Sequence, residues 1–373
     1  MKVLHILKTS NGGGWALRLM RELVALGVEV HVALPTDGIL IPEYRKYGIT
    51  IHKFDPSLRQ LNKSIKTLRT IVEEVKPDIV QSHFVITTIL MRLALRNINI
   101  PRIFEVPGPL HLEHWHTRNA ELLLAQRNDY WIATCQWTKD RYVKSGINSS
   151  KVLKTFYGGD PINYTSDGKK FRAEFGINDD IFLVGMVAYM YPPKRYIGQK
   201  RGIKGHEDFI DAIKILQKKY KNIIGVCIGG AWGNAKEYEK SVRKYAKEKG
   251  ANVIFTGTRN DVKDIYPAFN CAVHPSHSEN LGGAGESICA GIPTIATNVG
   301  GFPDIVINNK TGLLVNPKDP QAIANAIEFY YHNHELGKSH ALSGRNYIIE
   351  NCNAKKTSKE VYDFYCEILN IPN

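Results

Sequence analysis

The chain has 373 residues, which is long enough for two domains that each bury a substantial core. Its content of 43% hydrophobic and 23% charged residues is that of an ordinary soluble protein, and no uncharged apolar stretch is long enough to span a bilayer. Lys and Arg number 49 against 36 Asp and Glu, a formal charge of +13, so we expect acidic partners such as nucleotide phosphates, an anionic membrane surface or nucleic acid.

The N-terminus and the cysteines indicate a cytoplasmic protein. The apolar run within residues 1–8 is too short for a signal peptide. The six cysteines show neither CxxC spacing nor a pairing pattern, so we expect reduced core residues. Any contact with the inner face of a membrane should be peripheral.

The first elements predict a βαβ unit. Residues 2–7 form a short apolar run that ends before three glycines, residues 15–26 show helical spacing, and residues 28–34 form a second strand. This order implies a parallel sheet with a ligand near a strand's carboxyl end. The turn lacks G-x-G-x-x-G spacing, so a nicotinamide or flavin site is not supported. Gly13 and Gly14 either let a donor or the opposite domain approach the backbone or serve only the chain reversal.

The alternation continues with a strand at 49–52, a helix near 58–75 and a strand at 78–83. The helix is basic and amphipathic, which would suit an anionic membrane, although a solvated basic face is commoner. Its basic residues are Arg59, Lys63, Lys66 and Arg69. His83 ends the second strand, where a histidine is more often structural than catalytic, and it is kept as an acceptor-side candidate.

Residues 107–118 are the least ordinary segment of the first half. They follow a strand at 102–106 and combine Pro and Gly with His, Glu, Trp and Arg. Such groups suit sugar hydroxyls and sugar faces, so we expect His111, Glu113 and His114 on the acceptor side. A Pro/Gly-bounded loop is normally exposed, and the alternative is packing against the first domain's own sheet. The H-x-x-H-x-H spacing lacks the HExxH arrangement and a cysteine partner, so no metal site is predicted.

The α/β pattern restarts after strands at 130–133 and 151–153 and a polar linker at 157–170. Strands at 181–187, 223–228 and 253–255 alternate with helices at 206–220 and 235–249. Two successive α/β units place a ligand cleft between them. Basic residues are concentrated between 189 and 205, where a diphosphate would meet them, although an unpaired basic surface loop is common. These residues are Lys194, Arg195, Lys200, Arg201 and Lys204.

A glycine loop lies within residues 271–293. Glu279 and Glu286 flank three glycines just before a helix expected at 286–290. Bare N–H groups at a helix start suit phosphate. The carboxylates would repel phosphate and better suit sugar or ribose hydroxyls. The loop therefore indicates a nucleotide-sugar, although a lone loop of this kind is more often a flexible glycine turn.

Several motifs together resemble one family. They are Lys204-Gly205-His206, Phe255-Thr256-Gly257-Thr258-Arg259, Pro275-Ser276, residues 279–286 with Gly291-Ile292-Pro293, and Gly300-Gly301-Phe302-Pro303-Asp304. They resemble the retaining glycosyltransferases of family GT4, which have the GT-B fold. The resemblance covers nearly the whole chain and is most specific between residues 204 and 304.

The glutamate motif departs from the family pattern. Family members usually have seven residues between the two glutamates, whereas this chain has a Glu-x6-Glu variant. Holding Glu286 fixed puts Ser278 in the place of the first glutamate. A one-residue deletion after Glu279 instead keeps both carboxylates, and we prefer that register.

A family arginine is also missing. Ala188-Tyr189 stands where the family has a Gly-Arg pair, and an insertion delays Lys204. Arg201, ahead of Lys194 and Arg195, is therefore the candidate for the second phosphate-binding cation. The family's acceptor-side histidine falls near Pro107, which makes His111 a displaced candidate.

The resemblance implies an α/β GT-B protein with two Rossmann-like domains that face each other across a cleft. We expect an acceptor-side domain at 1–165, a nucleotide-sugar domain at 166–352 and a C-terminal helix at 353–373 that returns to the first domain. The implied reaction is retaining, metal-independent transfer of a hexosyl group from a nucleotide-sugar, with UDP favoured, to a hydroxyl of a glycan or lipid-linked acceptor in polysaccharide assembly. No cofactor is implied, and the oligomeric state stays open.

The resemblance also implies residue roles. The nucleobase would lie near Thr258 and Arg259, the ribose at Glu286 and the sugar hydroxyls at Glu279. The catalytic candidates are Lys204, Glu279, Arg201 and His111. The donor-binding candidates are Gly13, Gly14, Lys204, Thr258, Arg259, Glu279, Asn280, Gly282, Gly283, Ala284 and Glu286. The acceptor-binding candidates are His83, His111, Glu113 and His114.

Two other functions are compatible with parts of the sequence. A nucleotide-sugar epimerase of the same fold would need no acceptor. A non-enzymatic nucleic-acid-binding protein would use the positive charge, but no helix-turn-helix, zinc finger or RNP-type segment supports it, and no nucleic-acid partner is expected.

Overall fold

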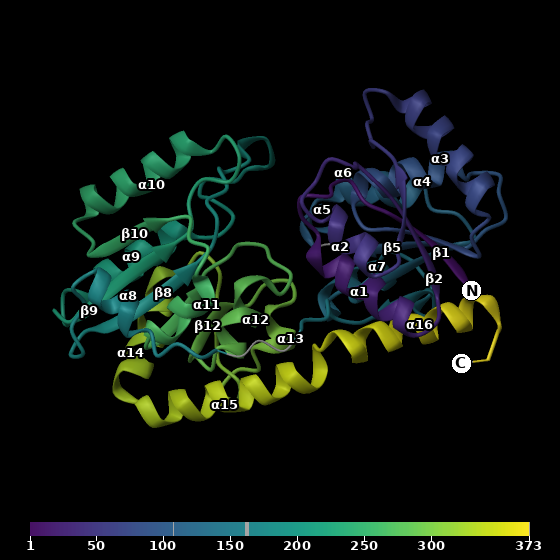
Figure 1. Ribbon diagram of the computed structural model, residues 1–373. Helices are drawn as coiled ribbons and strands as arrows, with labels where there is room; N and C mark the ends of the chain where they lie inside the picture. Colours follow the sequence, from purple (N-terminus) through teal and green to yellow (C-terminus); the bar gives the residue numbers. More distant parts are fainter. Residues whose placement is uncertain (107, 161–163, 373) are drawn as a thin grey trace. The chain divides into compact units, whose positions relative to one another are not determined.

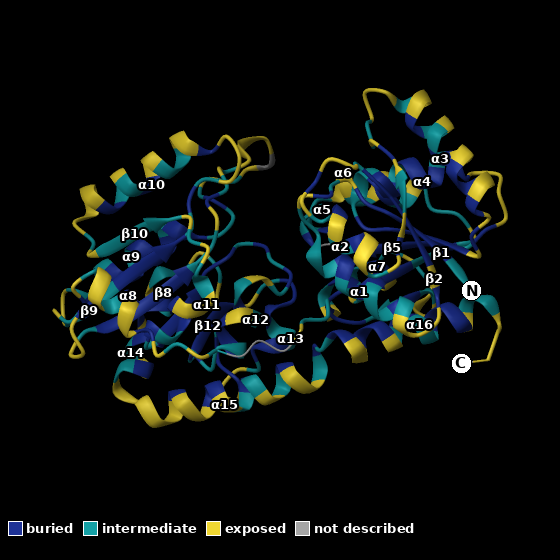
Figure 2. Ribbon diagram, viewed as in Figure 1, coloured by how far each residue is buried: buried dark blue, intermediate teal, exposed yellow. Residues whose placement is uncertain are grey.

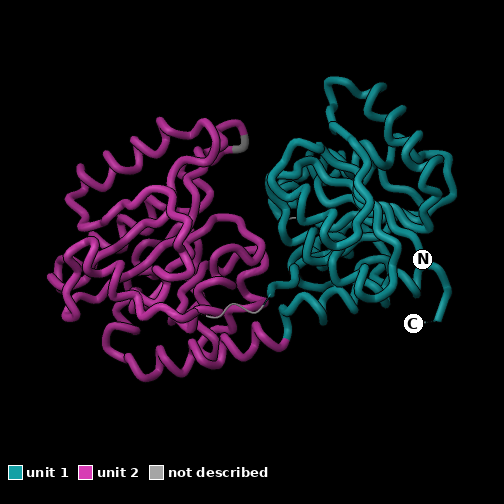
Figure 3. The backbone as a smooth tube through the Cα atoms, viewed as in Figure 1, with its two compact units in different colours: residues 1–160, 351–373 teal, residues 161–350 magenta. Residues whose placement is uncertain are grey.

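The computed structural model describes residues 1–106, 108–160 and 164–372 (Figure 1). Pro107, which begins the predicted acceptor-side loop, and residues 161–163 of the predicted linker lie outside the described residues. The chain divides into two compact units (Figure 3). Unit 1 holds residues 1–160 and 351–373, and unit 2 holds residues 161–350. The sequence analysis places the two domain boundaries after residue 165 and after residue 352.

Unit 1 is built on a seven-stranded parallel sheet with the order β3-β2-β1-β4-β5-β6-β7. Its strands are β1 (Lys2–Ile6), β2 (Glu29–Leu34), β3 (Thr50–Lys53), β4 (Ile79–Ser82), β5 (Arg102–Val106), β6 (Asp129–Ala133) and β7 (Val152–Lys154). Its helices are α1 (Gly14–Ala25), α2 (Ile41–Lys46), α3 (Leu61–Val75), α4 (Val85–Ala94), α5 (Leu110–Glu113), α6 (Trp115–Leu123), α7 (Gln136–Lys144) and α16 (Ala354–Leu369), with a 3-10 turn at Ser149–Lys151.

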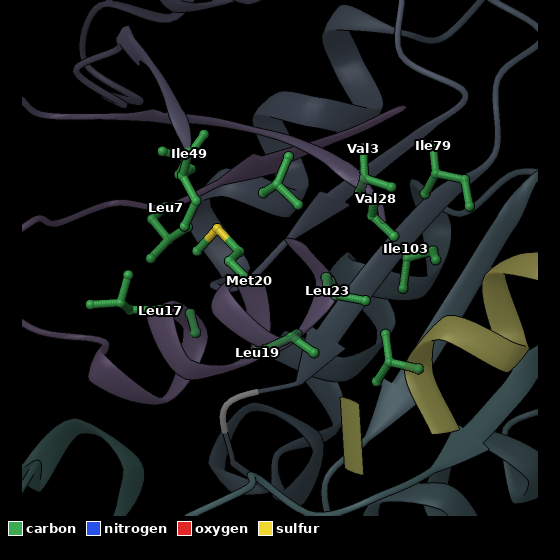
Figure 4. Close-up of a cluster of buried hydrophobic side chains, with 14 of the residues drawn as sticks. Val3, Leu7, Leu17, Leu19, Met20, Leu23, Val28, Ile49, Ile79 and Ile103 are labelled. Carbon is green, nitrogen blue, oxygen red and sulfur yellow. The ribbon is translucent and has the colours of Figure 1, made fainter. Parts of the chain in front are cut away.

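The core of unit 1 lies between its sheet and α1. Leu19, Met20 and Leu23 occupy one face of α1, because residues three and four positions apart share a helix face. They are buried in one cluster with strand residues such as Val3 and Ile79 (Figure 4). Burying one such side chain contributes about 1.5–3 kcal/mol.

The C-terminal helix α16 is part of unit 1. It packs against α1 and places Val361, Phe364 and Tyr365 in the same core. Just before this helix, the N–H of Gly159 donates to the carbonyl of Cys352 at 2.8 Å, and the N–H of Ala354 donates to the carbonyl of Gly159 at 3.0 Å. The chain therefore leaves unit 1 and re-enters it at adjacent positions.

Unit 2 has a six-stranded parallel sheet with the order β10-β9-β8-β11-β12-β13. Its strands are β8 (Phe182–Val187), β9 (Ile223–Ile228), β10 (Val253–Gly257), β11 (Cys271–His274), β12 (Thr294–Thr297) and β13 (Leu313–Val315). Its helices are α8 (Lys169–Glu174), α9 (His206–Leu216), α10 (Lys236–Lys249), α11 (Val262–Ile265), α12 (Gly282–Cys289), α13 (Phe302–Ile305), α14 (Pro320–His332) and α15 (His334–Asn351), with 3-10 turns at Arg195–Ile197 and Tyr266–Ala268.

Both sheets are parallel and carry helices between successive strands, which confirms the predicted pair of Rossmann-like α/β units. In unit 2 the chain runs outward from β8 to β10 and then returns to add β11 on the other side of β8. Within the described residues, no helix is long and apolar enough to cross a membrane.

Two predicted elements differ from the structure. Residues 110–113 and 115–123 are helical, so the loop expected at 107–118 is wrong for its described part. Leu112 is fully buried, whereas Trp115, His116 and Thr117 are exposed as expected. The helix expected at 286–290 is α12, which begins earlier, at Gly282. The glycines of the predicted loop therefore form the first turn of a helix.

Candidate functional site

A cavity of about 380 Å³ lies at the carboxyl ends of β8, β9, β10 and β11 in unit 2. The strand order reverses between β8 and β11, and ligands of open parallel sheets bind at such a switch point. Many of the predicted donor-site residues line this cavity. They are Lys204, Thr258, Arg259, Glu279, Gly282, Gly283 and Glu286.

The amino end of α12 contributes backbone groups to the cavity. Gly282 and Gly283 line it, and the first N–H groups of a helix have no partner within the helix. A Cβ on Gly283 would lie 3.1 Å from both His274 Cε1 and the carbonyl oxygen of Val187, so only glycine fits without a shift. Exposed N–H groups and the helix dipole together favour an anion here.

Lys204 and Glu279 form an ion pair in the cavity. Their side chains are only 21% and 14% exposed, so neither charge is well solvated. The N–H of Asn280 donates to Glu279 Oε1 at 3.1 Å, and Lys204 Nζ lies 5.8 Å from the ring centroid of Tyr191. The predicted phosphate-binding cation and the predicted sugar-binding carboxylate therefore lie in direct contact.

Glu286 lies on α12 at another part of the cavity wall. The Tyr266 hydroxyl donates to Glu286 Oε2 at 3.0 Å. Burial raises the pKa of Glu286 above the ordinary value of 4.5, and this hydrogen bond opposes the shift. A carboxylate that is only partly satisfied by tyrosine can accept a further hydrogen bond from a hydroxyl.

Thr258 and Arg259 follow β10 and line the same cavity. The guanidinium of Arg259 bonds to both oxygens of Glu174, at 2.6 and 3.0 Å, and to both oxygens of Asp261, at 2.9 and 2.8 Å. These hydrogen bonds raise the pKa of Arg259. Arg259 is thus held rigidly beside the cavity by two carboxylates, which offset its charge.

Three predicted site residues of unit 2 do not line this cavity. Arg201 pairs with Asp208 and Asp211 and lies 3.2 Å from the Tyr245 hydroxyl, so the structure does not place its guanidinium where a donor phosphate would lie. Asn280 and Ala284 are buried behind the cavity wall. The sequence did not predict the partners of Arg201, because Asp208 and Asp211 come from α9 and Tyr245 comes from α10.

The sequence analysis did not predict the aromatic residues at the rim of this cavity. Tyr189 and Tyr191 line the cavity, and the ring of Trp232 lies 5.1 Å from Tyr189 and 5.7 Å from Tyr191 between centroids. A backbone bridge between Met190 and Ala231 holds the segments after β8 and β9 together. The sequence signal that could have predicted this rim is the presence of aromatic residues just after two neighbouring parallel strands.

His274 is another missed residue of the cavity wall. Its Nε2 lies 2.9 Å from the Ser287 hydroxyl on α12. Burial and the charge of Lys204 lower the pKa of His274 to about 3, so the ring is neutral at pH 7. It fixes α12 against the end of β11.

The glycine and histidine candidates near the start of unit 1 have structural roles. Gly13 adopts the left-handed conformation at φ 86° where α1 begins, and Gly14 is the first residue of that helix. His83 is fully buried, with Nε2 at 2.8 Å from His5 Nδ1 and Nδ1 at 2.9 Å from Glu105 Oε2. Both contacts are to side chains of unit 1, which is typical of a structural histidine, and the acceptor-side assignment of His83 stays a prediction.

The remaining acceptor-side candidates lie on α5 and at the start of α6. His111 Nε2 is 3.4 Å from the Tyr142 hydroxyl, and burial lowers its pKa to about 4. Glu113 and His114 are half-buried, whereas the neighbouring Trp115 is 69% exposed. The predicted role of His111, Glu113 and His114 toward an acceptor stays a prediction. Within the described residues no group of three or more His, Cys, Asp or Glu side chains could hold a metal ion.

Comparisons with known proteins extend over both units. Residues 195–347 match the family model described as "Glycosyl transferases group 1", and residues 14–153 match the model described as "Glycosyltransferase Family 4". The chain is 28% identical over 393 residues to the capsular polysaccharide biosynthesis glycosyltransferase CapM of Staphylococcus aureus, covering 98% of this chain and 96% of that protein.

A second relative matches over a shorter stretch. The D-inositol 3-phosphate glycosyltransferase of Corynebacterium urealyticum is 32% identical over 140 residues, which cover 35% of this chain and a third (33%) of that protein. Among solved structures, Anabaena HepE in complex with UDP is similar with a TM-score of 0.82 and 20% identity, covering 98% of this chain and 100% of that one. At that identity the likeness shows the fold.

Proposed function

The chain belongs to the GT4-type glycosyltransferases of the GT-B fold, and from this premise we propose that it transfers a hexosyl group from a uridine nucleotide-sugar to an acceptor hydroxyl with retention at the anomeric carbon. The observation that carries the proposal is the cavity at the switch point of unit 2. There the amino end of α12, Lys204, Glu279 and Glu286 converge on one space.

The cavity can hold the donor in one orientation. The diphosphate suits the N–H groups at the start of α12 and the ammonium of Lys204. Glu286 then accepts from ribose hydroxyls and Glu279 from hydroxyls of the sugar. The nucleobase lies toward Thr258 and Arg259. Crystal structures of Anabaena HepE in complex with UDP and with UDP-glucose support a uridine donor.

Catalysis follows from charge that develops on the leaving group. As the bond from the anomeric carbon to the phosphate oxygen breaks, negative charge grows on the diphosphate, and Lys204 with the α12 amides stabilises it. The new bond from the acceptor oxygen forms on the same face of the sugar. The acceptor proton passes to a phosphate oxygen of the departing diphosphate. In this proposal the protein's own charges suffice, so transfer should persist in excess EDTA.

We place the acceptor among the glycans and lipid-linked saccharides of polysaccharide assembly. The name of CapM, which assigns that protein to capsular polysaccharide biosynthesis, supports this class. Helix α3 has an exposed side (Figure 2), and its exposed residues include Lys63 and Lys66. These basic residues would suit an anionic membrane that carries such an acceptor.

The test is a panel of nucleotide-sugars. A donor at a hundred times its dissociation constant stabilises the fold by about 2.7 kcal/mol, which a thermal-shift assay detects. NMR of the best donor alone and with sugar acceptors then follows the anomeric centre. With an α-linked donor, an α-configured product of transfer or of slow hydrolysis supports the proposal. Epimerisation of the donor without an acceptor, or a β-linked product, contradicts it.

A further inference from the structure

The segment that joins β8 to α9 carries free positive charge at the edge of the cavity. Tyr191 and Lys204, near its two ends, both line the cavity. Between them Lys194, Arg195 and Lys200 are exposed, and none of the three forms an ion pair within the described residues. We call residues 191–203 the basic flap.

The cavity itself has little free positive charge for a phosphate. Among its described lining residues the Lys and Arg side chains are Lys204 and Arg259. Glu279 pairs with Lys204, and Glu174 and Asp261 hold Arg259. A nucleoside diphosphate brings a multiple negative charge, so its binding here calls for a cation that carboxylates do not already neutralise.

Arg201 cannot be that cation without breaking its own contacts. It anchors the carboxyl end of the basic flap to α9 through Asp208 and Asp211. Gly202 lies under Tyr238, because a Cβ there would be 2.0 Å from the Tyr238 hydroxyl. This end of the flap is therefore fixed at the rim of the cavity.

The start of the flap presents the free cations in a closed turn. The N–H of Lys194 donates to Gln199 Oε1 at 2.9 Å, and Gly198 turns the chain in the left-handed conformation at φ 78°. Lys194 and Arg195 thus follow Tyr191 after only two residues, Pro192 and Pro193, on a turn whose two flanking residues, Tyr191 and Lys204, line the cavity. Both side chains are exposed, and neither forms an ion pair within the described residues.

We propose that Lys194 and Arg195 form the second phosphate-binding group of this site, an inference that rests on the proposed function. The group takes phosphate oxygens by charge-assisted hydrogen bonds, with the guanidinium as the bidentate partner. The phosphate is that of the donor diphosphate or one carried by the acceptor.

The test compares the double variant Lys194→Ala, Arg195→Ala with a matched control, Lys221→Ala, Lys247→Ala. The control removes the same charge from exposed positions of unit 2 away from the cavity lining. Calorimetry measures binding of UDP, of uridine, and of inorganic pyrophosphate to UDP-saturated protein. We expect UDP to bind at least about tenfold more weakly to the flap variant, uridine equally to both, and the charge-conserving Lys194→Arg, Arg195→Lys to restore affinity.

The pyrophosphate measurement separates the two sources. Unchanged UDP affinity with lost pyrophosphate binding assigns the group to a phosphate on the acceptor. Equal affinities of the flap variant and the control for both UDP and pyrophosphate overturn the inference, even if the wild-type protein transfers sugar. Conversely, a wild-type protein that binds UDP through the flap but transfers no sugar contradicts the proposed function alone.

Discussion

The ammonium of Lys204 and the carboxylate of Glu279 are paired, although the proposed mechanism gives them different parts of the donor to bind. The pair joins the segment before α9 to the segment before α12, across the switch point of the unit 2 sheet. Donor binding must therefore redistribute the contacts of this pair between phosphate and sugar.

Replacing Lys204 by Ala should reduce turnover by about two orders of magnitude or more, because the lost contact strengthens as the leaving group gains charge. Steady-state rates with a saturating nucleotide-sugar measure this. Lys240→Ala on the exposed side of α10, where Lys240 pairs only with Glu237 among described residues, is the control. Near-normal turnover of the Lys204 variant would contradict the proposed mechanism.

Glu279→Gln should separate nucleotide binding from catalysis. The neutral amide no longer competes for the Lys204 ammonium, so UDP should bind as tightly as to the wild type or more tightly. Transfer should nevertheless fall by more than about tenfold, because a carboxylate acceptor for the sugar hydroxyls is gone. Calorimetry with UDP and rates with the full donor give the two readouts. Loss of UDP affinity would contradict the assigned role.

Gly283→Ala should weaken donor binding because the added methyl group meets His274 and the Val187 carbonyl at 3.1 Å. We expect a loss of about 1–3 kcal/mol in stability from overpacking and a matching fall in UDP affinity. Gly285→Ala is the matched control on the same helix, since its Cβ would meet only Ile305 Cδ1, at 4.0 Å. That variant should be neutral or slightly stabilising. Equal UDP affinities of both variants would contradict the assignment of α12.

The raised pKa of Glu286 predicts a pH dependence of donor binding. An ionised carboxylate accepts the ribose hydrogen bonds better, so UDP affinity should rise as the pH rises through that pKa, above 4.5. Stability has the opposite sign. The folded state holds its proton more tightly than the unfolded state, so this group's contribution to stability falls over the same window. Glu286→Gln should remove both trends, and a parallel pH profile of variant and wild type would refute the assignment.

His111→Ala should weaken sugar transfer while leaving UDP binding unchanged. The same change removes a half-buried ring that contacts Tyr142 and Phe104, so some stability is lost as well. Rates per folded molecule therefore have to be compared, with His116→Ala at an exposed position of α6 as the control. Equal rates per folded molecule for both variants would leave His111 with a packing role alone.

Local sequence patterns were enough to predict the cavity-lining residues that stand beside a strand end or a helix start. The glycines before α12, Glu279, Glu286 and Lys204 each stand next to a strand end or helix start, and the parallel topology brings such ends to one edge. Arg201 could not be placed in this way. Its position depends on carboxylates of α9, whose direction the sequence does not show.

The prediction of a loop at 107–118 failed for a different reason. Proline and glycine at the start of residues 107–118 favoured a loop, yet Leu112 had a buried position to fill beside Trp131 and Tyr142, and this packing stabilises two short helices. Tertiary packing outweighed the local turn signal. The rim formed by Tyr189, Tyr191 and Trp232 was missed because aromatic residues beside strands are usually core.

The adjacent exit and entry points at Gly159 and Ala354 make unit 2 a cassette inserted into unit 1. Gly158 allows this closeness, since a Cβ there would lie 2.4 Å from Ala354 Cα. A variant in which unit 2 is deleted and the two ends are joined by a short linker should therefore give a unit 1 that folds on its own. Simple truncation after unit 2 would instead strip that half of the apolar face that α16 supplies to its core.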